Sequence, residues 1–166
     1  NGIASFHNNS AALHDNFNMS FDVSEYSEAQ IEKMYISRKT YNRHDYVKTY
    51  RKGNYLIAKT NILGDYTLSS DEVHPKIAPV NFKENQPLAK QTELIVKVSD
   101  SDSGIKSYRG EIDGKFILLE YDPKNNKLSY DLSDRDWDAN EHTMTITLVD
   151  NVNNSTTFTT KFFKKD

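Results

Sequence analysis

The sequence contains no cysteine in 166 residues, which excludes disulfide bridges and thiolate metal sites but leaves export open. It also lacks an excess of positive charge: the formal net charge is −3, whereas nucleic-acid binding requires a basic face. No apolar run approaches the ~20 residues that cross a bilayer. The polar stretch that starts at Asn1 has no basic-then-apolar signal-peptide pattern. We therefore predict no nucleic-acid partner and no membrane span.

The motifs of common catalytic sites are missing as well. A catalytic zinc needs three protein ligands and an open position, but the histidines form no His-x-His, no His-Glu-x-x-His and no i, i+4 pair. There is no Gly-x-Ser-x-Gly and no glycine-rich phosphate loop. The histidines are His7, His14, His44, His74 and His142. We predict that they are ordinary surface or strand-edge residues, that the chain is not an enzyme by itself, and that it holds no cofactor.

Residues that favour strands and turns are abundant. The chain has 10 tyrosines and 8 phenylalanines, and serine, threonine, asparagine and aspartate are frequent. The clearest stretch runs from Ser99 to Asp131. Asp113-Gly114 separates the expected strands Ile105–Asp113 and Lys115–Asp122 and predicts a type I′ hairpin. A second turn at 122–126 and a strand at Lys127–Leu132 would complete a three-stranded β-meander.

Seven expected strands follow one another at short intervals in the C-terminal part of the chain, which is typical of an Ig-like sandwich. They are Ile77–Phe82, Thr92–Ser99, Ile105–Asp113, Lys115–Asp122, Lys127–Leu132, His142–Val149 and Ser155–Phe163. Their alternation points a set of apolar residues inward, namely Leu94, Val96, Val98, Met144, Ile146, Leu148, Phe158 and Phe162.

The N-terminal part also has strand patterns, and one short helix. Phe17–Val23 alternates apolar and polar residues with period two, as a half-buried strand does. Ser27 is expected to cap a short helix through Gln30 or Ile31. The prolines in Asp71–Pro79 indicate a linker. The prediction is an all-β chain of tandem β-sandwich modules, a first β-rich module at 1–73 and an Ig-like one at 74–166.

Two groups of residues are candidates for binding. Aromatic side chains could form a platform for sugar or peptide, and the candidates are Trp137, Tyr108 and Tyr121; a tryptophan in an acidic loop could instead cover the edge of the core. Asp100, Asp102 and Asp150 lie in loops expected at one end of the second module and are weak calcium candidates. The alternative, which we favour, is that these acids bond the backbone of their own loops, so that the chain has no metal site.

Long segments of the chain resemble a known family. SGIKSYRGEIDGKFILLEYD at 103–122 and LVDNVNNS at 148–155 are similar to the C-terminal Ig-like domain of secreted murein endopeptidases. These are zinc metallopeptidases of the lysostaphin/LytM type from Gram-negative bacteria. The resemblance continues through 13–36 and 63–82, but it covers accessory domains; the family's catalytic motifs, His-x-x-x-Asp and His-x-His, do not occur here.

The resemblance implies a non-catalytic accessory region of an exported cell-wall peptidase, located in the periplasm or cell envelope. Its partners would be a catalytic domain upstream in the same polypeptide and the glycan or peptide of the cell wall. In the resembling proteins further strands precede the segment that begins at Leu13, so the first module is expected to be partial. The alternative is an independent carbohydrate-binding or adhesin-like module with the same fold.

Overall fold

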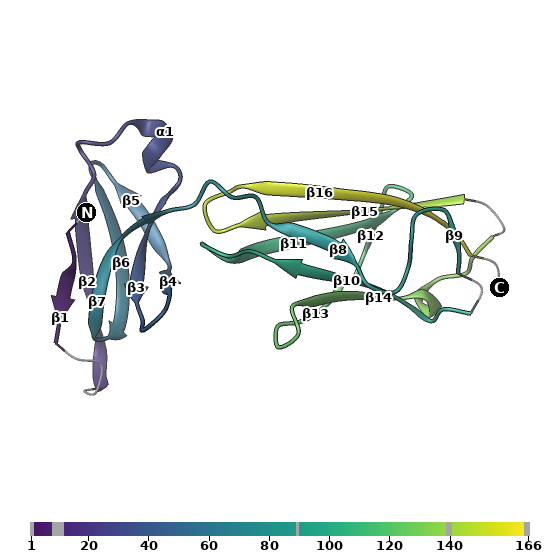
Figure 1. Ribbon diagram of the computed structural model, residues 1–166, viewed down its shortest axis with the longest axis horizontal. Helices are drawn as coiled ribbons and strands as arrows, with labels where there is room; N and C mark the ends of the chain where they lie inside the picture. The colour runs from purple at the N-terminus through teal and green to yellow at the C-terminus, as the bar shows by residue number, and fades with distance from the viewer. Residues whose placement is uncertain (1, 8–11, 89, 139–140, 165–166) are drawn as a thin grey trace. The chain divides into compact units, whose positions relative to one another are not determined.

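The computed structural model describes residues 2–7, 12–88, 90–138 and 141–164. The chain divides into two compact units, residues 1–73 and residues 74–166 (Figure 1). Strands make up most of both, which confirms the all-β prediction. No helix in the described ranges has the length and apolar character needed to cross a membrane.

The first unit has two antiparallel sheets, with strand orders β1–β7–β3–β4 and β2–β6–β5. The strand bounds are β1 Ala4–Phe6, β2 Ala12–Asp22, β3 Met34–Lys39, β4 His44–Val47, β5 Thr49–Lys52, β6 Tyr55–Ile62 and β7 Gly64–Ser70. The polar segment 40–52 supplies β4, which forms a hairpin with β3, and β5, which forms one with β6. The turn of the second hairpin contains Gly53 with φ +57°.

Side chains from both sheets fill the core of the first unit. Met19 on β2 and Leu56 on β6 pack with Ile36 on β3 and Tyr66 on β7. The alternation around Met19 therefore indicated the correct inward face. The short helix α1 spans Glu28–Ile31 and has Ser27 as its N-cap, as the sequence predicts. Ser27 also forms a capping box with Gln30.

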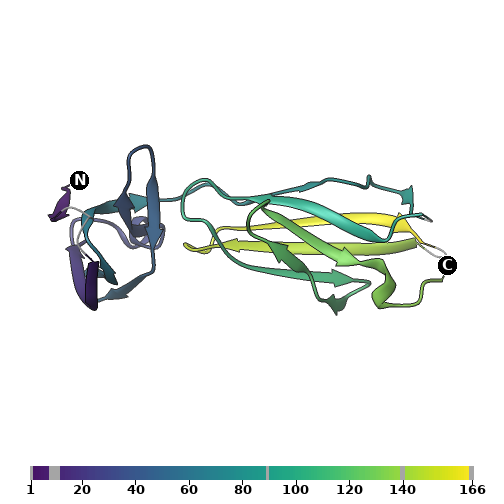
Figure 2. The same ribbon diagram turned by 90° about the horizontal axis from the view of Figure 1, so that it is seen from below.

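The second unit is a sandwich of two sheets, with strand orders β13–β14–β10–β8 and β12–β11–β15–β16–β9. In Figure 1 the yellow-green pair β15 and β16 lies above β10 and β14. The bounds are β8 Lys76–Pro79, β9 Gln86–Pro87, β10 Glu93–Ser99, β11 Ile105–Ile112, β12 Lys115–Ile117, β13 Glu120–Asp122, β14 Lys127–Asp131, β15 Glu141–Asp150 and β16 Ser155–Phe163. A 3₁₀ turn, η1, spans Leu132–Asp134 and appears in light green after β14 in Figure 2.

The two turns of the predicted meander, at Asp113-Gly114 and at 122–126, are confirmed, but its single middle strand is wrong. β11 and β12 pair antiparallel, and both turn residues have positive φ, +53° and +72°. The expected strand Lys115–Asp122 is broken at Leu118–Leu119. Its first half stays beside β11 and its second half crosses to the other sheet, where it pairs with β14. The crossing buries Leu119, which is 5% exposed, between the sheets. Burial of this leucine therefore accompanies the break in the strand.

The core of the second unit lies between its sheets. Leu94, Val96 and Val98 on β10 are at most 2% exposed. Met144, Ile146 and Leu148 on β15 face them from the opposite sheet and are equally buried. Phe162 on β16 is fully buried and Phe158 is partly buried against the same core. The inward positions read from the sequence are thus the observed ones.

Candidate functional site

A cluster of polar and aromatic side chains surrounds the β11–β12 turn of the second unit. Asp113 ties this turn to the start of β15, because its N–H donates to the carbonyl of Thr143 and its Oδ1 accepts the N–H of Thr143, both at 2.9 Å. Positive φ at Asp113 and Gly114 allows these two residues alone to close the turn, and the turn then lies close to Thr143. The carboxylate is thereby held at one end of the sandwich.

His142 lies behind Asp113 and is only 5% exposed. Its Nδ1 is 2.9 Å from Oδ2 of Asp113, and its Nε2 is 3.3 Å from Oδ1 of Asp138. The ring also packs edge-on against Trp137, with centroids 4.9 Å apart. The prediction of a surface or strand-edge histidine is therefore wrong for His142. The burial of His142 could have been predicted from the sequence. His142 and Met144 are two positions apart on one strand, so their side chains point to the same face, and Met144 was predicted to face inward.

The Asp113 carboxylate is the electrostatic centre of this cluster. Burial acts to raise its pKa, but the N–H of Thr143 and the side chains of His142 and Arg135 together hold that pKa below its ordinary value. Arg135 Nη2 lies 3.8 Å from Asp113 Oδ2. The carboxylate consequently favours its ionised form and anchors the loop that carries Arg135.

Trp137 belongs to the core and does not form an open platform. Its indole is 7% exposed, and its Nε1 donates to the carbonyl of Leu132 at 2.6 Å. Phe162 packs edge-on against it at 5.5 Å, and the Arg135 guanidinium lies 4.8 Å from its ring centroid. Of the two readings of this tryptophan, the structure supports the one in which it covers the edge of the core.

The loop at 133–138, which contains Trp137, lies between two surface hollows. The first has a volume of about 610 Å³ and lies beside β12 and the loop. The second, of about 500 Å³, lies between the loop, the segment before β10 and the end of β16. Both are lined by Arg135 and Asp136, so they adjoin each other. Sequence reasoning did not single out these two residues, because no motif relates them to the distant segments that complete the hollows.

The two tyrosine candidates meet at a different place on the second unit. Tyr108 on β11 and Tyr121 on β13 come from opposite sheets, and their ring centroids are 5.8 Å apart. They are 38% and 37% exposed. Trp137 is buried elsewhere, so the three aromatic candidates do not form one surface.

The weak calcium candidates lie in loops at the other end of the second unit. Oδ1 of Asp100 accepts the N–H groups of Asp102 at 3.2 Å and Gly104 at 2.7 Å. Oδ1 of Asp150 accepts those of Val152 at 2.9 Å and Asn154 at 2.8 Å. Asp100 and Asp150 therefore bond the backbone of their own loops, as expected. Asp102 is exposed and accepts from Ser101 at 3.3 Å.

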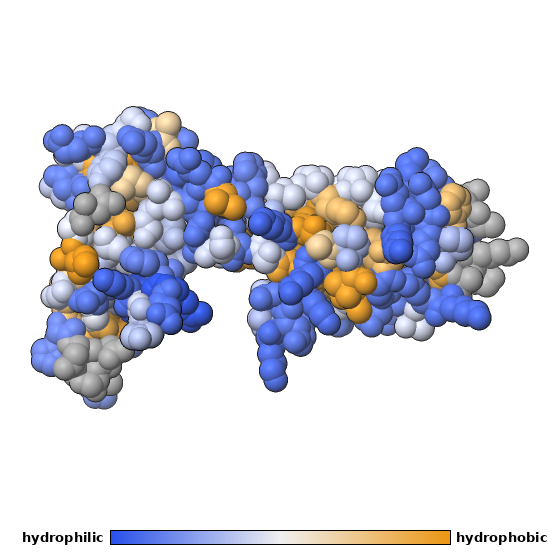
Figure 3. Space-filling view, viewed as in Figure 1, coloured by the Kyte–Doolittle hydropathy of each residue, from blue (hydrophilic) through white to orange (hydrophobic). Residues whose placement is uncertain are grey.

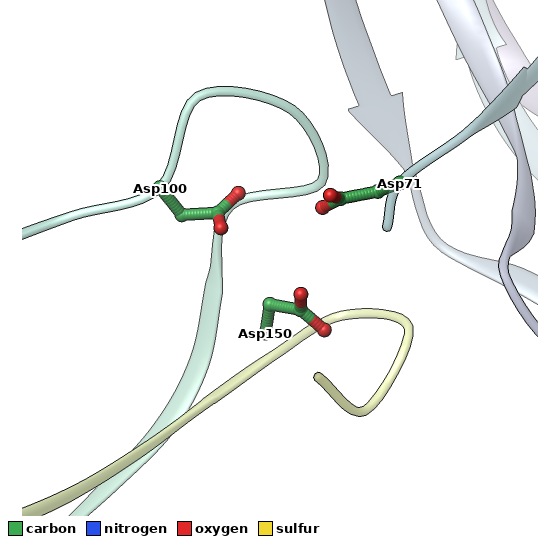
Figure 4. A group of neighbouring side chains, drawn as sticks. All are labelled: Asp71, Asp100 and Asp150. Atoms are coloured by element: carbon green, nitrogen blue, oxygen red, sulfur yellow. The ribbon is translucent and has the colours of Figure 1, made fainter. Parts of the chain in front are cut away.

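Figure 4 shows Asp100 and Asp150 on neighbouring loops of this end, with carboxylate oxygens within 4.8 Å of each other. Two carboxylates are fewer than the six to eight oxygens that calcium takes. Asp71, drawn in the same view, belongs to the first unit, where its Oδ1 accepts the N–H of Val73 at 2.9 Å. Within the described residues, no histidine belongs to a group of three side chains placed to share a metal ion.

Comparison with protein families finds one match, a Zu5-like domain over residues 2–71, which corresponds to the first unit. The comparison with curated proteins finds no match.

Three solved structures share parts of the architecture at low identity. An endo-β-1,4-mannanase from Thermotoga petrophila is 13% identical, with 58% of this chain and 21% of that one covered and a TM-score of 0.45. Fibronectin(III)-like modules of Clostridium thermocellum CbhA are 16% identical, with 91% and 86% covered and a TM-score of 0.43. Dimeric latent PorU from Porphyromonas gingivalis is 12% identical, with 91% and 20% covered and a TM-score of 0.45.

The chain thus spans about a fifth of the mannanase and of PorU. At these TM-scores the likenesses carry no functional argument. The assignment of two β-sandwich modules rests on the sheets and cores described above.

Proposed function

We propose that this chain is a non-catalytic accessory region of an exported murein metallopeptidase, which positions the catalytic domain or binds the cell wall. The observation that carries the proposal is the pair of sandwiches in tandem, each with its own core. Modules with separate cores are suited to spacing and binding, because each holds its surface independently of the other. The sequence resemblance to the accessory domains of LytM-type enzymes supplies the finer identity.

The parent protein would be a zinc enzyme whose metal ligands lie outside this chain. Its partners would be that catalytic domain and cell-wall glycan or peptide, and its location the periplasm or cell envelope. The coding sequence upstream of Asn1 tests this directly. A His-x-x-x-Asp and a His-x-His there would support the proposal, and a stop codon directly before an independent signal peptide would overturn it.

A biochemical test uses the purified chain and isolated murein sacculi. We expect the chain to sediment with sacculi and to release no soluble murein, with or without added zinc. Asn1–Val73 and His74–Asp166 assayed separately would locate the binding unit. Zinc-dependent hydrolysis by the chain alone, lost on replacing His14 or His142, would refute the non-catalytic role.

The second candidate is an independent carbohydrate-binding or adhesin-like module. The observation that favours it is the pair of adjoining hollows on the second unit, since binding to a soluble ligand requires no catalytic neighbour. Strong binding to soluble glycans, together with no sedimentation on sacculi, would favour this candidate over the first.

A further inference from the structure

The two hollows beside the loop that carries Arg135 have a balanced set of charges. The first is lined by the cations Lys115 and Arg135 and by the anions Asp134 and Asp136. The second shares Arg135 and Asp136 and adds one cation, Lys164, and one anion, Asp131. A small anion or cation entering either hollow would meet as many repelling as attracting groups. The lining therefore favours a neutral ligand that can both donate and accept hydrogen bonds.

Apolar surface borders the first hollow. Phe116 on β12 is 60% exposed and Leu118 beyond it is 69% exposed, which is high for large apolar side chains. The Arg109 guanidinium lies 5.3 Å from the Phe116 ring centroid and helps to hold the ring in place. In the view of Figure 3, hydrophobic surface gathers over the middle of the second unit amid mostly hydrophilic surroundings. A ring beside polar groups suits a ligand with an apolar face and a hydroxyl-bearing rim.

The polar groups of the site are preorganised. Arg135 is held by the Trp137 ring and by Asp113, at 3.8 Å, and its side chain is 28% exposed. The carboxylate of Asp131 is fixed by the N–H and hydroxyl of Ser133, at 2.8 and 2.7 Å. Ordering these groups therefore costs little when a ligand binds.

Gln91 is one of the polar residues that line the second hollow. Its Nε2 donates to the carbonyl of Asn81, whereas its Oε1 is buried and accepts no hydrogen bond from the residues that the structure describes. The bond to Asn81 fixes the amide of Gln91 at the edge of this hollow.

We propose that the two hollows form one binding site for a neutral oligosaccharide, which crosses the ridge made by Arg135 and Asp136. One sugar would lie against Phe116, with its hydroxyls bonded to Asp134, Arg135 and Asp136. The next would reach the second hollow, near Gln91 and Lys164. The inference deepens the binding role proposed above and rests on it, because it specifies where and what the second unit binds.

The test is a titration of the ¹⁵N-labelled chain, followed by backbone amide shifts, with four tetrasaccharides. Cellotetraose and chitotetraose are neutral, tetragalacturonate is anionic and tetraglucosamine is cationic. We expect at least one neutral probe to shift the amides of 115–118 and 131–136, and the charged probes to bind more weakly. Absence of binding by both neutral probes, or shifts confined to the opposite end of the unit, would overturn the proposal. So would tighter binding of a charged probe.

Two exposed side chains allow substitution without disturbing the core. Phe116→Ala and Asp136→Asn should each weaken binding of the neutral probe by about tenfold, as expected for a lost stacking surface or a lost charged hydrogen bond. Asp102→Asn, an exposed carboxylate at the other end of the unit, and Tyr50→Ala, an exposed aromatic in the first unit, are the matched controls and should not change it. Equal affinities for all four variants would refute the assigned site.

Sedimentation with sacculi separates this inference from the proposed function. If the wild-type chain sediments but neither neutral probe shifts the amides of 115–118 and 131–136, the cell-wall role stands and the oligosaccharide site is refuted. If a neutral probe binds at the site but the chain does not sediment, the site stands and the murein role fails.

Discussion

Gly110 provides a test of how the crossing between the two sheets of the second unit is packed. It lies on β11, is buried, and faces Leu119 and Ile117. A Cβ built on it would lie 2.7 Å from Cδ1 of Leu119, 2.8 Å from its Cγ and 2.9 Å from Cγ1 of Ile117. Carbon atoms prefer separations of about 3.5–4.0 Å, so an added methyl would push both side chains outward.

The expected magnitude for Gly110→Ala combines two opposing effects. Overpacking in a filled core costs roughly 1–3 kcal/mol. Replacing glycine with alanine also restricts the unfolded chain, which stabilises by about 0.4–1 kcal/mol where the native backbone is compatible. The φ of Gly110 is outside the left-handed region, so the second effect applies in full. We expect a net destabilisation of about 1–2 kcal/mol.

Urea unfolding followed by tryptophan fluorescence measures this change. Trp137 is the only tryptophan of the chain and is buried in the second unit, so its signal reports on that unit alone. Ser107→Ala, at an exposed position of the same strand, is the control and should alter stability by no more than about 0.5 kcal/mol.

A double mutant makes the test specific to the contact. Leu119→Ala alone should cost roughly 2–5 kcal/mol, because it leaves a cavity. In the double mutant the new methyl of residue 110 occupies part of that cavity, so the combined loss should be smaller than the sum of the two. Additive losses, or a Gly110→Ala variant as stable as the wild type, would refute the packing described here.

Four further outcomes are expected. Gly114→Val should destabilise the second unit by roughly 1 kcal/mol or more, measured by the same urea assay, because a β-branched residue resists the φ of +72° although no atom obstructs its Cβ. Ser27→Ala should cost the first unit about 1 kcal/mol, measured by hydrogen exchange of its core amides, through loss of the capping box. The pKa of Asp113 is lower in the folded chain than the unfolded value of 3.8, so its carboxylate stabilises the fold at pH values above 3.8, and this contribution is lost as the pH falls through the folded pKa. The stability of Asp113→Asn should therefore decline less on acidification than that of the wild type. Identical pH profiles would contradict the ion-pair geometry. Calcium or a chelator should leave the melting temperature unchanged, since Asp100 and Asp150 bond loop N–H groups; a chelator-induced fall of several degrees would show a metal site instead.

The sequence determined most of the strands, because their signals are local. Period-two alternation gave the inward faces around Met19 and Met144, and Asp113-Gly114 gave the hairpin through the positive φ that the turn requires. Ser27 gave the helix start through its side-chain oxygen. Each of these depends only on neighbours a few residues away.

Only the tertiary structure decided where the chain changes sheets. Nothing within Lys115–Asp122 distinguishes one continuous strand from two, because both halves have strand-forming residues. The break at Leu118–Leu119 follows from β14 taking the second half as its partner, while Leu119 becomes buried against Gly110. β14 in turn pairs with β10, which lies far earlier in the chain, so a non-local contact decides which sheet holds β13.

The candidate binding site was also a product of tertiary structure. Trp137 was visible in the sequence, but its burial against His142 and Phe162 depends on two strands that follow it. That burial holds Arg135 in place beside Asp113, from a turn more than twenty residues earlier. Phe116, Gln91 and Lys164 are brought to the same loop by the closing of the sandwich. A site built from segments so far apart has no sequence motif, because only the folded chain fixes the distances between its residues.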